Sequence, residues 1–211
     1  MPALDELREK IGRCSSSRKM DISNGGEVHA VTFQPLATRQ NQDRLVVHEF
    51  QIHGQAWLLL AVCDGEFFAH SPSYMHSESR PIAVGHGGAS TARYTASHLP
   101  SRISTYISRI VASGLRGRRD RRTMLRKASM ISSELRRCVK DFDRELGHVV
   151  QTICPEPAQL SGEQACGLVQ EYPDALWRAY AGTTLAAAVV NLDNRIMWTI
   201  NVGDSTIGEW C

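Results

Sequence analysis

The sequence has few aromatic residues, almost no net charge and no long apolar run. Aromatic residues make up 7% of its 211 residues, and the formal net charge is +2. A membrane-spanning helix needs about 20 consecutive apolar residues, whereas the apolar run 57–63 has only the length of a strand. We therefore expect no membrane partner, and the overall charge does not favour any class of partner.

The sequence also lacks the cysteine spacings of a zinc or redox motif. None of its six cysteines forms a Cys-x-x-Cys pair or a paired Cys/His arrangement, which argues against a structural zinc site. No apolar leader is present in residues 1–20. The cysteines are therefore interpreted as reduced thiols, and we expect an intracellular protein, cytoplasmic or nuclear.

One segment, residues 116–140, is strongly basic, with ten Arg and Lys residues against two acidic ones. Apolar residues recur every three or four positions over 123–146, which predicts a helix with the basic residues on its polar face. A solvated helix face is a sufficient explanation of this charge. Nucleic-acid binding is the weakest functional alternative, because no aromatic residues are interleaved with the basic ones.

The remaining pattern predicts a mixture of strands and helices that does not alternate as a Rossmann fold does. We predict strands over 28–33, 45–50, 55–63, 183–190 and 196–202, with turns at His53-Gly54 and at 192–194. A helix should begin near Gly88, and Pro100 predicts a kink or an early break in it. Residues 1–24 should form a short amphipathic helix followed by a flexible segment, and 113–122 and 151–170 should be loops.

Two short motifs contain the residue types of a metal site. The first is Val62-Cys63-Asp64-Gly65, where an apolar strand ends in Asp-Gly, and the second is Gly85-His86-Gly87-Gly88. Joined, they read Val-Cys-Asp-Gly-His-Gly-Gly. This places a carboxylate, a backbone carbonyl and an imidazole together, and carboxylate and carbonyl oxygens favour Mg²⁺ or Mn²⁺.

In these motifs the chain resembles the metal-dependent protein phosphatase 2C (PPM-type) family. Three further segments agree with that family in order and spacing: Asn41-Gln42-Asp43-Arg44, Gly182-Thr183-Thr184 and Val202-Gly203-Asp204-Ser205. The resemblance covers about residues 25–208, the first half or so of such a domain. It implies an α+β fold, a partial β-sandwich of mostly antiparallel strands flanked by helices, with an incomplete domain over 25–211 after the N-terminal segment 1–24.

The resemblance also implies a protein serine/threonine phosphatase that hydrolyses phosphoserine and phosphothreonine in a phosphoprotein substrate. Such a domain holds two Mg²⁺ or Mn²⁺ ions, which activate water and clamp the displacement at phosphorus. Its pattern assigns metal binding to Asp43, Asp64, Gly65 and Asp204, and the general acid to His86. Arg39 or Arg44 is expected to contact substrate phosphate in bidentate fashion, although the family's usual phosphate arginine lies slightly further upstream, near Thr38. Gln42 stands where many members have Glu.

The family's later aspartates have no counterpart in this sequence, so we expect impaired metal binding and activity. A non-catalytic, phosphatase-like binding module is therefore the main alternative function. The metal motif is also interrupted by residues 66–85, which have no periodic pattern. Removing them restores the uninterrupted motif, and we interpret them as an insertion, with an in-frame retained intron as the hypothesis that explains it.

Overall fold

The structure is a computed structural model that describes residues 2–33, 42–65, 87–112 and 121–208. The chain divides into two compact units, residues 1–41 and 42–211. Both contain antiparallel strands and helices, which confirms the predicted α+β class. The division falls between residues 41 and 42, whereas the sequence predicted a boundary at 24/25. Within the described ranges, every helix is too short or too polar to span a bilayer.

The first unit consists of helix α1 (Pro2–Cys14) and a hairpin of strands β1 (Ser15–Asp21) and β2 (Glu27–Phe33). The helix confirms the predicted amphipathic segment, but the flexible segment expected after it is a strand instead. β1 is held by contacts across the hairpin: the hydroxyls of Ser16 and Thr32 lie 2.6 Å apart, and Lys19 forms an ion pair with Glu27. Because β1 is polar along most of its length, its alternation carries no hydrophobic signal.

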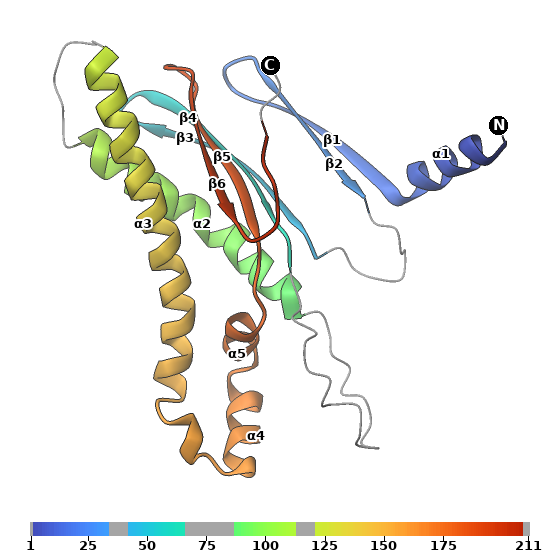
Figure 1. Ribbon diagram of the computed structural model, residues 1–211, viewed down its shortest axis with the longest axis vertical. Helices are drawn as coiled ribbons and strands as arrows, with labels where there is room; N and C mark the ends of the chain where they lie inside the picture. Colours follow the sequence, from blue (N-terminus) through green and yellow to red (C-terminus); the bar gives the residue numbers. More distant parts are fainter. Residues whose placement is uncertain (1, 34–41, 66–86, 113–120, 209–211) are drawn as a thin grey trace. The chain divides into compact units, whose positions relative to one another are not determined.

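The second unit is built on a four-stranded antiparallel sheet with the strand order β3-β4-β5-β6 (Figure 1). The strands are β3 (Arg44–Ile52), β4 (Gln55–Cys63), β5 (Leu185–Asn191) and β6 (Ile196–Val202). All four confirm the strands predicted from the sequence. At one end of the sheet the two hairpins are joined to each other, since the Ala56 amide donates to the Asp193 carboxylate at 2.9 Å.

Helices α2 (Gly87–Ala112) and α3 (Arg121–Ile153) cover one face of this sheet (Figure 1). α2 runs without interruption through Pro100, so the predicted early break is wrong. A proline inside a helix costs about 3 kcal/mol, and burial of Leu99, Ile103 and Ile107 against the sheet offsets that cost. α3 is longer than the predicted 123–146 at both ends.

The predicted loop 151–170 is also wrong in part. A 3₁₀ turn (Pro157–Gln159) lies within it, helix α4 (Gly162–Glu171) occupies its last part and ends one residue beyond it, and α5 (Pro173–Tyr180) follows. α4 begins with a capping box: the Ser161 side chain accepts from the Gln164 amide, and the Gln164 side chain accepts from the Ser161 amide. The Ser-x-x-Gln spacing is a recognisable helix start. The prolines and glycines around it favour a loop, which is why the pattern as a whole predicted one.

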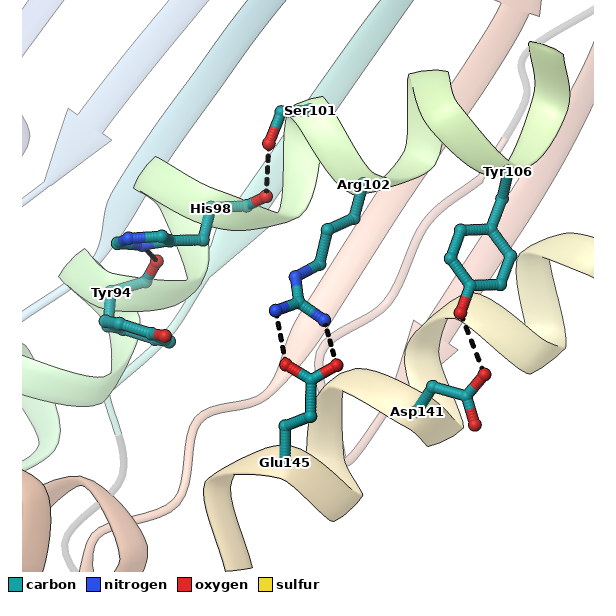
Figure 2. Close-up of polar contacts among 7 residues, drawn as sticks. All are labelled: Tyr94, His98, Ser101, Arg102, Tyr106, Asp141 and Glu145. Atoms are coloured by element: carbon teal, nitrogen blue, oxygen red, sulfur yellow. Dashed lines mark hydrogen bonds and ion pairs between the residues drawn. The ribbon is translucent and has the colours of Figure 1, made fainter. Parts of the chain in front are cut away.

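Polar contacts join α2 to α3 along their exposed side (Figure 2). The Arg102 guanidinium forms a bidentate contact with the Glu145 carboxylate, and the Tyr106 hydroxyl donates to Asp141 at 2.8 Å. The contact with Arg102 holds the pKa of Glu145 below its ordinary value. These contacts fix the register of the two helices, which in turn fixes the apolar surface that they present to the sheet.

Candidate functional site

Four strand ends meet at the end of the sheet opposite to the Ala56–Asp193 contact. β3 and β5 begin there, whereas β4 and β6 end there, because all neighbouring strands are antiparallel. The last pairs of the ladders are Arg44 with Cys63, Val62 with Ala186, and Leu185 with Val202. Continuing each register to the residues just past the strands therefore aligns Asp43, Asp64, Thr184 and Gly203 in one row across the sheet.

Asp43 and Asp64 bring their carboxyl groups into contact in this row. The hairpin register accounts for it, since each residue lies one position beyond the paired Arg44 and Cys63. Although Asp43 as a residue is exposed, its carboxyl is partly desolvated. That desolvation, followed by the hydrogen bond and the charge repulsion from Asp64, raises the pKa of Asp43 to about 6. Two carboxylates meeting in this way are the donor type that a hard divalent cation prefers.

Arg44 adds one positive charge beside the Asp43–Asp64 pair. Its guanidinium donates a hydrogen bond to the Asp43 backbone carbonyl at 2.7 Å, and its charge opposes the rise in the pKa of Asp43. The effect of Arg44 is smaller than that of Asp64, so the net environment of Asp43 still disfavours its ionised form.

The backbone of Asp64 is held from β5. The Asp64 carbonyl accepts a hydrogen bond from the Thr184 amide at 2.9 Å and a second from the Thr183 hydroxyl at 2.7 Å. On its other side, Asp64 follows Cys63, which is fully buried in the core between the sheet and the helices. Asp64 therefore projects from a strand end that is fixed both by core packing and by hydrogen bonds.

The turn after β6 packs against Thr184. Thr184 is 2% exposed, and its hydroxyl is hydrogen-bonded to the Ser205 hydroxyl. Gly203 has a positive φ of 85°, and a Cβ added there would lie 2.7 Å from the Thr184 methyl carbon. Glycine is required here for both reasons, because other residues rarely adopt this φ and no space is left for a side chain.

We expect Gly203→Ala to lower the free energy of unfolding by about 2 kcal/mol, from the strained φ together with the clash on Thr184. Urea unfolding followed by circular dichroism measures the change. Gly208→Ala is the matched control, since a Cβ at Gly208 meets no atom of the described residues within 4 Å and that glycine has no positive φ. An equal effect of the two substitutions would show that the packing of Gly203 is unimportant.

The structure brings together some of the predicted site residues and not others. Asp43 and Asp64 are in contact, and Gly65 is buried directly after Asp64. Asp204 lies exposed in the turn between Gly203 and Ser205, and among the described residues no group of three or more His, Cys, Asp or Glu side chains is arranged to hold a metal. His86 and Arg39, the predicted general acid and phosphate ligand, lie outside the described residues, as does the whole of the insertion 66–85.

Thr183 and Thr184 are the residues at this site to which the sequence assigned no role. The Gly-Thr-Thr motif predicts a strand start, but its hydrogen bonds to Asp64 join residues that are 119 and 120 positions apart in the chain. The available signal was the order of the motifs, because a central antiparallel strand that begins beside the end of β4 must place its first residues next to Asp64.

Comparison with known proteins finds no match: no protein-family model, no curated protein and no solved structure is similar to this chain.

Proposed function

We propose that this protein is a divalent-cation-dependent phosphatase that acts on phosphoserine and phosphothreonine in proteins. The observation that carries the proposal is the contact between the carboxyls of Asp43 and Asp64 at the common end of four strands. The two carboxyls are a cation-type donor set, and the pKa of Asp43 is raised by desolvation first, then by the hydrogen bond and the charge repulsion from Asp64. A bound cation would relieve this repulsion, so the residues present fit part of a Mg²⁺ or Mn²⁺ site.

The proposed fold is one layer of a phosphatase 2C-like β-sandwich, formed by the four-stranded sheet with α2 and α3 on one face. In that arrangement Asp43, Asp64 and the Gly65 carbonyl hold the metal, and Asp204 belongs to an additional site. When bound, the metal supplies Lewis acidity toward the phosphoryl oxygens and a water of lowered pKa. Two such ions are expected for a complete domain of this kind.

The chain's own residues would bind the substrate and move protons. Arg44 lies beside the Asp43–Asp64 pair, where a guanidinium is able to contact a phosphate in bidentate fashion. Arg39 is proposed for the same role from its place in the sequence. His86 is proposed as the general acid for the leaving serine or threonine oxygen, since the pKa of an imidazole lies near neutrality.

Hydrolysis of a phosphothreonine peptide in the presence of Mn²⁺ tests this function. We expect phosphate release that rises with the Mn²⁺ concentration, stops when EDTA is added and returns when Mn²⁺ is restored. Release that persists unchanged in EDTA would contradict a metal-dependent reaction. The absence of release at any Mn²⁺ or Mg²⁺ concentration would contradict the catalytic function.

A second candidate function is a non-catalytic, phosphatase-like binding module. It is favoured by the finding that no third acidic, histidine or cysteine side chain joins Asp43 and Asp64 in a metal-binding group within the described ranges. Tight binding of two metal ions needs more ligands than two carboxylates and one carbonyl. Binding of the phosphothreonine peptide without release of phosphate would favour this alternative.

A further inference from the structure

We infer that Thr183 is a positioning residue for the proposed metal ligands, an inference that rests on the proposed function. The Thr183 hydroxyl donates to the Asp64 carbonyl at 2.7 Å. Thr183 lies just before β5, and its hydroxyl joins that segment to the Asp-Gly end of β4. The hydrogen bond acts on the peptide group that links the predicted ligands Asp64 and Gly65.

This peptide group needs such support because the ladder between β3 and β4 ends one residue earlier, at the pair Arg44 and Cys63. Beyond that point the described hydrogen bonds to the Asp64 carbonyl come from Thr183 and Thr184. Together, the hydroxyl and the amide occupy both acceptor positions of one carbonyl oxygen. They fix the plane of the peptide that links Asp64 to Gly65, and with it the backbone from which the Asp64 side chain projects.

The Asp64 carboxylate also has to remain beside Asp43 despite the repulsion between the two groups. A rotation of the Asp64 peptide would let its carboxylate move away from Asp43, and the hydrogen bond from Thr183 opposes that rotation. Groups that orient a metal ligand in this way typically change metal affinity by about 10- to 100-fold when they are removed. We therefore assign Thr183 an effect on the metal ligands that exceeds its effect on folding.

Thr183 is better suited to an experiment than Thr184. Thr184 is buried, bonded to Ser205 and packed against Gly203, so its replacement disturbs the fold. Thr183 is only half-buried. Thr183→Val keeps the shape of the side chain and removes the hydroxyl, whereas Thr183→Ser keeps the hydroxyl and removes the methyl group.

The test measures Mn²⁺ affinity by calorimetry and hydrogen exchange of the Thr184 amide by NMR, which needs no metal. We expect Thr183→Val to weaken Mn²⁺ binding about tenfold and to speed exchange at Thr184 several-fold, and Thr183→Ser to restore both. Thr152→Val is the matched control, because it removes an equivalent 2.9 Å hydroxyl-to-carbonyl bond in α3, and it should leave both readouts unchanged.

The outcomes separate this inference from the proposed function. Unchanged exchange at Thr184 in Thr183→Val, or unchanged Mn²⁺ affinity in a protein that binds Mn²⁺, overturns the positioning role. If the unmodified protein binds no Mn²⁺ while Thr183→Val still speeds exchange and Thr183→Ser restores it, Thr183 positions Asp64 and the metal-dependent function fails.

Discussion

We expect the replacement of Asp64 by asparagine to abolish the proposed Mn²⁺-dependent hydrolysis, with a fall in kcat/KM of at least about a hundredfold. Asparagine has nearly the same shape but no negative charge, so it removes one of the two carboxylates that meet at the strand ends. A metal ion that neutralises phosphoryl oxygens supplies several kcal/mol of transition-state stabilisation, and a hundredfold loss corresponds to about 2.7 kcal/mol. Steady-state kinetics on a phosphothreonine peptide measure the change.

The control for this substitution is Asp143→Asn, which neutralises an exposed aspartate on α3 far along the chain from the site. It should retain full activity. A kcat/KM for Asp64→Asn close to that of Asp143→Asn would contradict a role for Asp64 in catalysis.

A loss of folding would not explain the expected result, because Asp64→Asn should stabilise the protein at neutral pH. The folded-state pKa of Asp43 is raised to about 6 from an ordinary value of 3.8. The folded state therefore holds this proton more tightly than the unfolded state, and stability falls as the pH rises from about 4 through about 6. Removing the Asp64 charge reduces this loss, so the free energy of unfolding of Asp64→Asn at pH 7 should be no lower than that of the unmodified protein.

Trp57→Ala should lower the free energy of unfolding by about 4 kcal/mol, the largest effect that we expect of a single core substitution. Trp57 is 1% exposed on β4, and its indole stacks between Phe50 and Trp198 at centroid distances of 6.2 and 5.6 Å. Truncation to alanine removes both ring contacts and leaves a cavity between the sheet and the helices. Chemical denaturation at constant pH measures the loss.

Two further variants separate packing from hydrogen bonding in this ring stack. Among the described residues, no acceptor binds Nε1 of Trp57, whereas Nε1 of Trp198 donates to the Ala128 carbonyl at 3.0 Å. Trp57→Phe should therefore cost under about 2 kcal/mol, since it removes a buried donor that has no partner. Trp198→Phe should cost more, because it also removes the hydrogen bond from Nε1 to the Ala128 carbonyl. The opposite order would contradict this description of the core.

The sequence predicted the central sheet because hydrophobic patterning and turn residues both indicated it. β4 is apolar along most of its length and ends in Asp-Gly, and His53-Gly54 marks the turn that pairs it with β3. Once these strands form an antiparallel hairpin, the contact between Asp43 and Asp64 follows from the register. That part of the candidate site could therefore be predicted from residues close together in the chain.

The parts that were missed depend on distant contacts or on competing local signals. β1 is polar and is recognisable only by its pairing with β2, and α2 continues through Pro100 because of apolar burial that a local rule on proline does not include. α4 had a capping box that the surrounding prolines and glycines obscured. The hydrogen bond from Thr183 to Asp64 depends on the placement of β5 beside β4, which no local pattern specifies.

Asp43 and Asp64 are proposed to form a divalent-cation site, and paramagnetic broadening by Mn²⁺ in an NMR titration tests this proposal at the residues themselves. We expect the amide signals of Asp43, Asp64, Gly65 and Thr184 to broaden first, at low Mn²⁺ concentrations, and we expect Asp64→Asn to remove this effect. Broadening that begins at other acidic residues, or that is the same in the unmodified protein and in Asp64→Asn, would contradict it.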